Sequence, residues 1–224
     1  MKYDQTHTLQ HIASPLGDII LTSTAKGLSG LWFDGQKHQP DLSQCTPGAS
    51  QTTQLAAQQI TQYFAGQRTH FDVPLDLSGG TAFQQAVWQA LLAIACGTHS
   101  SYGTVARAIH KQTAVRAVGA AVGRNPISII VPCHRVLGGD GSLTGYAGGL
   151  GRKTALLKLE GAVPGTVLGA VSEALPSAMP GAVSGELPRA EQHARQHTQQ
   201  DLQRNAQQNM QQSIWPDAQP DRLI

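Results

Sequence analysis

The 224-residue chain is long enough for one large domain or two small ones with hydrophobic cores. Its apolar runs are too short to cross a bilayer, and its first residues lack a signal-peptide core, so we expect a cytoplasmic protein with no membrane partner. The net charge is only +2, yet residues 81–163 carry eight Lys/Arg against two carboxylates; this segment indicates a polyanion partner, or else a merely solvated basic face.

Antiparallel strands are predicted over residues 8–33. The stretches 19–21 and 28–33 are rich in strand-forming residues, and turn residues at 15–18 and 25–27 precede them. A small sheet should therefore open the chain.

A loop, a helix and an edge strand are predicted next. Residues 36–50 are loop-like, and Gly66 ends a helical pattern that follows them. The segment 71–77 predicts a short strand, and Pro74 places it at a sheet edge because proline has no N–H for the ladder. We expect residues 1–79 to form an N-terminal α/β domain. The helical pattern comprises Leu55, Ile60, Tyr63 and Phe64.

A second domain, residues 80–163, is predicted to begin with a helix. Thr81 and Gln84 have the spacing of a capping box, and Gly97 is the candidate C-cap. The buried face of this helix is expected to contain Phe83, Val87, Leu91 and Ile94.

Two short helices at 102–109 and 114–122 follow, with Thr113 as candidate N-cap of the second. Their short connection is typical of a helix-turn-helix. Arg116 lies off the apolar stripe of the second helix, so its side chain should point outward. That stripe contains Val115, Val118 and Val122.

The run Pro132-Cys133-His134-Arg135-Val136 places a thiol beside an imidazole after the apolar segment 127–131. A free cysteine is only slightly ionised at neutral pH, and a neighbouring base raises the thiolate fraction. We therefore predict a nucleophile at the end of a buried strand. An inert buried cysteine and a cysteine hydrolase with a distant histidine are the alternatives. Cys45 and Cys96 are interpreted as structural, because three cysteines without Cys-x-x-Cys spacing argue against a disulfide framework or a cysteine-built zinc site.

Residues 164–224 differ in composition from the rest of the chain. They are rich in Gly, Ala, Pro and Ser and then in Gln, with too little apolar surface for a core. We expect a disordered, flexible tail.

The chain resembles the O6-alkylguanine-DNA alkyltransferases, also called methylated-DNA–protein-cysteine methyltransferases, whose nucleophile motif is Pro-Cys-His-Arg-Val. The resemblance is strong over 80–163, looser over 1–79 and absent from 164 onward. It implies an α+β protein with a ribonuclease-H-like N-terminal domain and a mainly helical C-terminal domain containing a winged-helix-like helix-turn-helix. The other motifs that carry it lie at 83–88, 101–103, 116–121, 123–126, 144–149 and 156–161.

This resemblance implies a catalytic set. Cys133 would accept the alkyl group, and a water would link its thiol to His134, which Glu160 would hold and charge-stabilise. Tyr102 would give a proton to the guanine N3 as the base leaves. Asn125 would bridge backbone turns near the nucleophile.

The resemblance also implies a DNA-binding surface on the second helix of the helix-turn-helix, which enters the minor groove. Arg116 would fill the gap left in the base stack when the target nucleotide flips out of the duplex. Arg124 is a candidate phosphate contact. The remaining residues expected to face DNA are Tyr102, Ala117, Gly119 and Ala120.

The pocket for the flipped base is expected around the nucleophile. The Val136 carbonyl would accept from the guanine amino group, and the Ala147 amide would donate to the guanine oxygen. Tyr146 would form a wall, and Gly148 would let its loop approach the base.

The implied reaction is DNA repair by displacement of guanine with the Cys133 sulfur, once per chain. It needs no cofactor and no metal, acts on double-stranded DNA containing O6-alkylguanine and possibly O4-alkylthymine, and is expected of a monomer. The alternative is a non-catalytic protein of the same fold that binds alkylated DNA.

Overall fold

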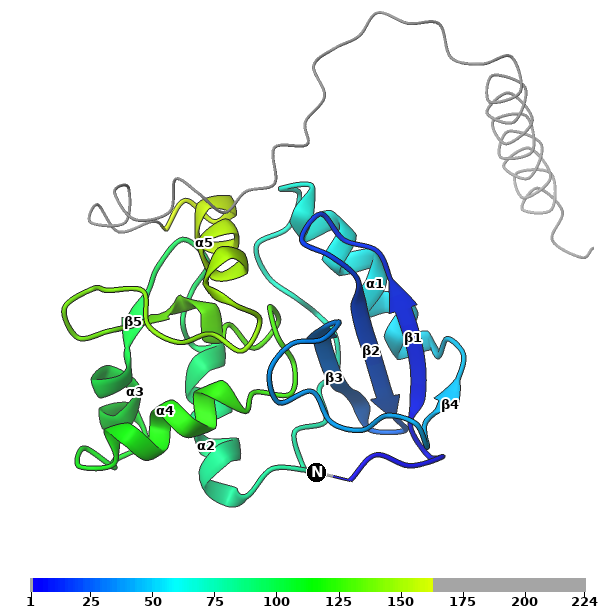
Figure 1. Ribbon diagram of the computed structural model, residues 1–224, viewed down its shortest axis with the longest axis horizontal. Helices are drawn as coiled ribbons and strands as arrows, with labels where there is room; N and C mark the ends of the chain where they lie inside the picture. The colour runs from blue at the N-terminus through cyan, green and yellow to red at the C-terminus, as the bar shows by residue number, and fades with distance from the viewer. Residues whose placement is uncertain (1, 163–224) are drawn as a thin grey trace, which may run out of the picture. The chain divides into compact units, whose positions relative to one another are not determined.

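The computed structural model describes residues 2–162, so the tail expected at 164–224 lies outside the described residues. The N-terminal half opens with a four-stranded sheet in the order β3-β2-β1-β4 (Figure 1). Its three long strands are antiparallel neighbours, as predicted for residues 8–33, and β4 pairs with β1 in parallel. The strands are β1 (Thr8–Ile12), β2 (Ile19–Thr24), β3 (Gly27–Phe33) and β4 (Thr46–Pro47).

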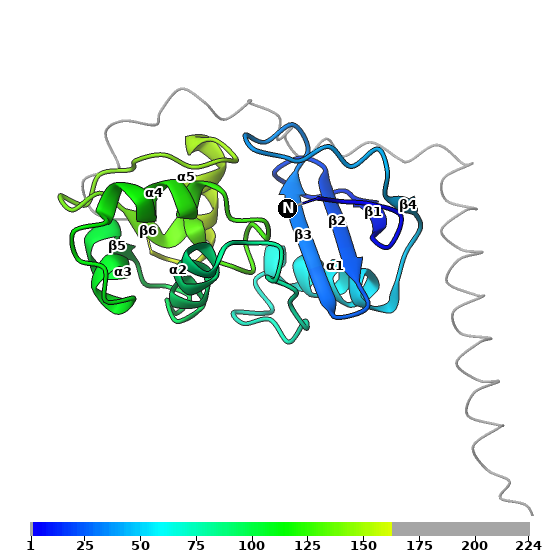
Figure 2. The ribbon, with the colours of Figure 1, turned by 90° about the horizontal axis from the view of Figure 1, so that it is seen from below.

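Helix α1 (Gln51–Phe64) packs against one face of this sheet (Figures 1 and 2). Ser50 begins it with a side-chain hydrogen bond to the Thr53 amide, and the helix buries Ile60 and Tyr63. Burying this apolar stripe against the sheet stabilises a helix that would be marginal alone.

The strand predicted at 71–77 is wrong. Only one bridge forms there, between Leu28 and Leu75. The Pro74 carbonyl accepts from the Leu28 amide and the Asp76 amide donates to the Leu28 carbonyl, both at 2.8 Å. Proline has no N–H for the next bond, so the ladder cannot extend past Pro74.

Helix α2 (Ala82–Leu92) begins with the predicted capping box of Thr81 and Gln84. Its C-cap is Ala93 rather than Gly97, so the helix is shorter than expected. Gly97 lies in the following turn with φ +79°, a backbone conformation that favours glycine. The glycine therefore serves this turn and not the end of the helix. Of its predicted buried face, Val87 and Leu91 are buried, and Phe83 and Ile94 are partly buried against the core.

Helices α3 (Tyr102–Ala108) and α4 (Val115–Gly123) form the predicted helix-turn-helix. Two details differ. Ala114, not Thr113, precedes α4, and it makes no side-chain cap bond. Val115 is 39% exposed, because the side chain of a helix's first residue points back past the helix end, while Val118 and Val122 are buried.

The chain then passes through a 3-10 helix, η1 (Cys133–Arg135), into strand β6 (Val136–Leu137) and ends its described part with helix α5 (Leu150–Leu159). β6 pairs in parallel with β5 (Ser100–Ser101). A single hydrophobic cluster contains residues from both halves of the described chain. None of the helices in residues 2–162 is long and apolar enough to span a bilayer.

Candidate active site

The segment before the nucleophile is a pair of tight turns, not the predicted buried strand. The Ile130 amide donates to the Ser128 carbonyl, and the Val131 amide donates to the Ile127 carbonyl. Ile129 has φ +68° and is fully buried. A β-branched residue in this left-handed region is a genuine outlier whose strain is of order 1–3 kcal/mol, and such strain clusters at functional sites.

The side chain of Asn125 holds these turns together. Its Oδ1 accepts from the Ile127 amide at 3.0 Å, and its Nδ2 donates to the Ile127 and Val131 carbonyls at 3.2 and 2.8 Å. The same Nδ2 lies 3.0 Å from the Cys133 sulfur. The expectation that Asn125 bridges turns near the nucleophile agrees with these contacts, which also offset the strain at Ile129.

Cys133 begins η1 and is only 4% exposed. Burial raises the pKa of its thiol, while the hydrogen bond from Asn125 and the positive charge of Lys153 act in the opposite direction. The net direction is upward, so the resting sulfur is a thiol that needs a base to become a nucleophile.

That base is positioned by a hydrogen bond to a carboxylate behind the cysteine. Nε2 of His134 lies 2.9 Å from Oε1 of Glu160, and the imidazole is fully buried. Burial lowers the pKa of His134, so the ring is neutral at pH 7. Because Glu160 is ionised at pH 7, Nε2 carries the ring proton and donates a hydrogen bond to the carboxylate. Nδ1 then keeps the basic lone pair, and within residues 2–162 this buried atom has no hydrogen-bond partner.

Three side chains converge on Glu160. Arg135 donates from Nε to Oε2 at 2.8 Å and from Nη2 to Oε1 at 2.9 Å, and the Tyr63 hydroxyl donates to Oε1 at 2.7 Å. Burial would raise the pKa of Glu160, but these bonds and the one to His134 outweigh it and lower the pKa to about 2. Arg135 therefore makes a structural contact with Glu160, and Tyr63 adds a second one from α1.

A cavity of about 180 Å³ lies beside these groups. Tyr102 and Tyr146 both line it, and both phenols are near enough to Cys133 that burial and, less strongly, a thiolate there raise their pKa. The Tyr102 hydroxyl lies 3.5 Å from the carbonyls of Thr144 and Gly145. The full lining comprises Lys37, His38, Tyr102, Gly119, Gly123, Gly145, Tyr146 and Ala147.

Comparison with known proteins agrees with this geometry. Models of 6-O-methylguanine DNA methyltransferase match the chain twice, the ribonuclease-like domain at 9–77 and the DNA-binding domain at 82–162. The methylated-DNA–protein-cysteine methyltransferase of Mycobacterium tuberculosis H37Rv is 50% identical over 149 residues, which cover 66% of this chain and 89% of that protein. The chain belongs to the methylated-DNA–protein-cysteine methyltransferase family.

Solved structures of the family match the fold as well. The crystal structure of Mycobacterium tuberculosis OGT in complex with DNA has a TM-score of 0.64 and 47% identity, and the match covers 69% of this chain and 93% of that one. An archaeal relative from Methanosarcina acetivorans is 45% identical over 149 residues, covering 66% of this chain and 95% of its own. The α+β fold, with a ribonuclease-like N-terminal domain and a helical DNA-binding domain, is confirmed.

The residues expected to face DNA in this family lie mostly on the open side of α4. Arg116, Ala117 and Ala120 are exposed, and so is Arg124 at the helix C-cap. Gly119 is half-buried, and a side chain added there would contact the ring of Tyr102. The absence of side chains at these small residues leaves the helix surface low around Arg116.

The expected pocket residues also lie close together. Tyr146 and Ala147 line the cavity. Gly148 is buried against Tyr146, where a Cβ would lie 2.6 Å from the ring, so glycine is required for this close approach. The Val136 carbonyl, expected to accept from the base, already accepts a hydrogen bond from the Lys153 ammonium at 2.6 Å and has one lone pair left.

Lys153 is a candidate functional residue that was not expected from the sequence. It is fully buried on α5, and its ammonium donates to the Val136 and Thr144 carbonyls at 2.6 and 2.7 Å. Burial lowers its pKa to about 8, an effect that the nearby Cys133 opposes, so it stays mostly protonated at pH 7. Within the described residues it forms no ion pair with a carboxylate. Its spacing from Leu156 and Leu157 places it on the buried face of the helix, which is the signal that sequence analysis had available.

No group of three or more His, Cys, Asp or Glu residues within residues 2–162 is placed to hold a metal ion. The three cysteines are free thiols.

Proposed function

We propose that this protein repairs DNA by moving an alkyl group from O6 of guanine to the sulfur of Cys133. The observation that carries the proposal is the Glu160–His134 pair behind a buried thiol, which is near enough to affect the two tyrosines that line a small cavity. Membership of the family supports the same chemistry, because its named relatives are methylated-DNA–protein-cysteine methyltransferases.

The protonation states of His134 and Glu160 support an attack that is assisted by a general base. Nδ1 of neutral His134 takes the thiol proton through a water, and ionised Glu160 stabilises the imidazolium that forms. The thiolate attacks the alkyl carbon, the carbon–oxygen bond breaks, and guanine leaves with the electron pair. Tyr102 protonates the leaving base at N3, and the proton held by His134 balances the one that Tyr102 gives.

Lys153 has two roles in this reaction, one electrostatic and one structural. Its positive charge stabilises the Cys133 thiolate as it forms, and its two hydrogen bonds fix the segments on either side of the pocket. The Ala147 amide donates to the departing guanine oxygen, and the free lone pair of the Val136 carbonyl accepts from the guanine amino group. Tyr146 and Gly148 shape the wall against which the base lies.

The substrate enters as a flipped nucleotide of double-stranded DNA. Helix α4 enters the minor groove, Arg116 fills the vacated place in the base stack, and Arg124 contacts phosphate. Flipping requires a few kcal/mol, which the Arg116 contact partly offsets. The small surface residues Ala117, Gly119 and Ala120 allow the helix backbone to approach the groove.

The product is a thioether at Cys133. It has no good leaving group, so each chain turns over once, as a monomer and without a cofactor. We also propose that the domain boundaries lie between residues 79 and 80 and between residues 163 and 164. We propose a cytoplasmic location as well, since three free thiols suit a reducing compartment.

Transfer of a labelled methyl group from O6-methylguanine DNA tests this function. Label should move to the full-length protein at about one equivalent, and Cys133→Ala should abolish transfer while DNA binding remains. Cys96→Ala is the matched control and should transfer normally. Continued turnover, or label on Cys45 or Cys96, would contradict the proposal.

A further inference from the structure

The cavity of about 180 Å³ beside Tyr102 and Tyr146 is called the base cavity below, and two of its lining residues come from the N-terminal domain. Lys37 and His38 lie in the loop after β3, and they complete a lining that is otherwise built from α3, α4 and the 145–147 loop. None of the site residues expected from the sequence lies in this domain. The cavity is therefore shared between the two domains of the chain.

The loop is fixed to the site by specific bonds. The Lys37 amide donates to the Ala147 carbonyl at 2.9 Å. Gln36, which is 6% exposed, accepts at Oε1 from the Phe33 amide at 3.1 Å and from the Ser128 hydroxyl at 3.2 Å. Ser128 belongs to the strained turn before the nucleophile. The loop thus contacts both the pocket loop and the nucleophile turn.

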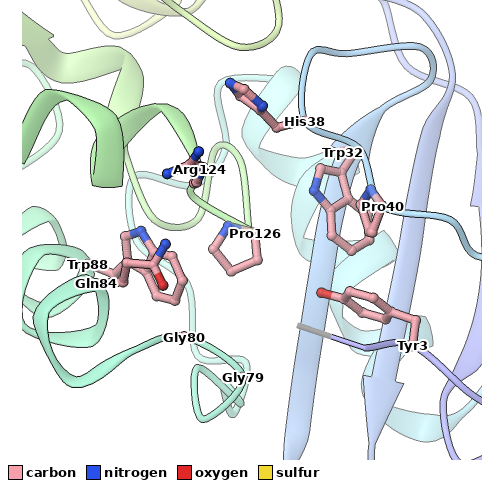
Figure 3. Close-up of a pocket in the computed structure, with 10 residues that line it drawn as sticks. All are labelled: Tyr3, Trp32, His38, Pro40, Gly79, Gly80, Gln84, Trp88, Arg124 and Pro126. Carbon is pink, nitrogen blue, oxygen red and sulfur yellow. The ribbon is translucent and has the colours of Figure 1, made fainter. Parts of the chain in front are cut away.

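His38 adopts a left-handed backbone with φ +65°, which is uncommon for a residue other than glycine. It also lines an adjacent cavity of about 290 Å³ between the domains (Figure 3). In that cavity Arg124 enters from the C-terminal domain and His38 from the N-terminal domain. His38 is therefore common to the base cavity and to its neighbour.

The electrostatics of this edge favour an anion. Lys37, His38 and Arg124 line the two cavities, and no carboxylate lines either of them. Lys37 is exposed and forms no ion pair with any residue of the described part of the chain. Helix α4 lines the same cavity through Gly119 and Gly123, so a strand that lies on α4 and sends a base into the cavity comes near Lys37 and His38.

We propose that the loop 34–39 of the N-terminal domain is part of the DNA-binding surface, and that the Lys37 ammonium binds a backbone phosphate of the extruded nucleotide. This inference rests on the proposed function. It deepens that function by giving the N-terminal domain a direct contact with DNA, in addition to the contacts of α4. A phosphate contact by lysine positions the strand and carries no sequence information.

The salt dependence of DNA binding tests the proposal. In the full-length Cys133→Ala background, which cannot transfer, Lys37→Met is compared with Lys26→Met, an exposed lysine of the β2–β3 turn that lines neither cavity. Anisotropy titrations use a duplex with one O6-methylguanine over a range of KCl. Loss of one phosphate contact should lower the slope of log K against log salt by about 0.9 in Lys37→Met, and Lys26→Met should keep the parent slope.

Transfer from a free O6-alkylguanine base, measured with Cys133 intact, separates charge from shape. This base has no phosphate, so Lys37→Met should lose much less of its transfer rate on the free base than on duplex DNA. An unchanged slope, an equal change in Lys26→Met, or a matching loss on the free base would each overturn the phosphate contact. If the parent protein transfers from neither substrate, the proposed function fails instead.

Discussion

The two domains contribute to the site in different ways. The C-terminal domain carries the groups that we propose react, namely the Cys133 thiol, the His134 imidazole and the Tyr102 phenol. The N-terminal domain reaches the same site mainly through supporting bonds. Tyr63 donates to Glu160, Gln36 accepts from Ser128, and the Lys37 amide donates to the Ala147 carbonyl.

The effect of a variant on the transfer rate should therefore depend on the distance of the changed group from the reacting atoms, and not on the domain to which it belongs. Removing a C-terminal group removes a proton, a charge or a nucleophile. Removing an N-terminal contact leaves those groups in place and loosens their positions. Variants of the C-terminal groups should therefore lose more activity than variants of the N-terminal contacts, and the reverse order would contradict this division between the domains.

The largest effect short of losing the nucleophile is expected for Glu160→Gln. The amide keeps the size of the carboxylate but cannot stabilise an imidazolium at His134, so the transfer rate should fall by roughly 10²–10⁴-fold. Arg135 also loses its buried counter-charge, and the free energy of unfolding should fall by about 3–5 kcal/mol. Single-turnover transfer and urea unfolding measure the two effects.

The stability loss should depend on pH in a defined direction. The pKa of Glu160 is lowered to about 2 from an ordinary value of 4.5, so its ionised form stabilises the folded state above about pH 4.5. The gap between wild type and Glu160→Gln should be full there and shrink as the pH falls toward 2. The exposed carboxylate Asp140 offers a matched control, since Asp140→Asn should leave transfer unchanged. A gap that does not change with pH would contradict the assigned charge.

Lys153→Met should have the next largest effect. Methionine fills the same buried volume but removes the positive charge near Cys133 and the bonds to the Val136 and Thr144 carbonyls. Alkylation of the Cys133 thiol by iodoacetamide at pH 7 should slow by about tenfold or more, and the pH profile of that rate should move to higher pH.

Lys158→Met is the control on the same helix, because Lys158 is exposed in the last turn of α5. It should alkylate like wild type. A Lys153→Met protein whose rate falls without any shift of the pH profile would show that the lysine only holds the pocket loops.

The helices and motifs of the C-terminal domain were predictable because their signals are local. The Thr81–Gln84 capping box and the α3–α4 turn depend on residues a few positions apart. The turn at 127–131 was not predictable in this way. Four apolar residues and one serine in five positions are typical of a buried strand, and only the Asn125 side chain, with the strained Ile129, makes them a turn.

The candidate site divides in the same manner. Cys133 and His134 are adjacent in sequence, so their nearness was readable from it. The family resemblance named Glu160 as their partner, and the structure places it 2.9 Å from His134. Lys37 and Tyr63 reach the site only through packing of the two domains, which no local pattern encodes.

Tyr63→Phe tests how much a contact from the N-terminal domain contributes to the site. It removes only the hydroxyl that donates to Glu160, a bond to a charged group worth about 1.5–3 kcal/mol of stability. Transfer should fall by less than about tenfold, because Arg135 still holds the carboxylate through two bonds. Tyr3→Phe, which loses a bond to the Ser29 carbonyl, should lose stability without any change in transfer. A loss in Tyr63→Phe as large as that in Glu160→Gln would break the comparison.

The smallest effect is expected for His38→Gly, and a second histidine supplies its control. His38 and His110 are both exposed and both left-handed, with φ +65° and +56°. Glycine relieves the strain but loses more conformational entropy on folding, so each change should raise the free energy of unfolding by no more than about 1 kcal/mol. Thermal unfolding should therefore show two similar, small gains.

Only His38→Gly should change the reaction, because His38 lines both cavities and His110 lies in the α3–α4 turn away from them. Removing the imidazole joins the space beside the base cavity to its neighbour, so transfer of a benzyl group should speed up relative to transfer of a methyl group. The ratio of the two rates, measured on free alkylated bases, isolates pocket shape from DNA contacts. Equal ratios in the two variants would mean that the N-terminal loop does not limit the alkyl group that the site accepts.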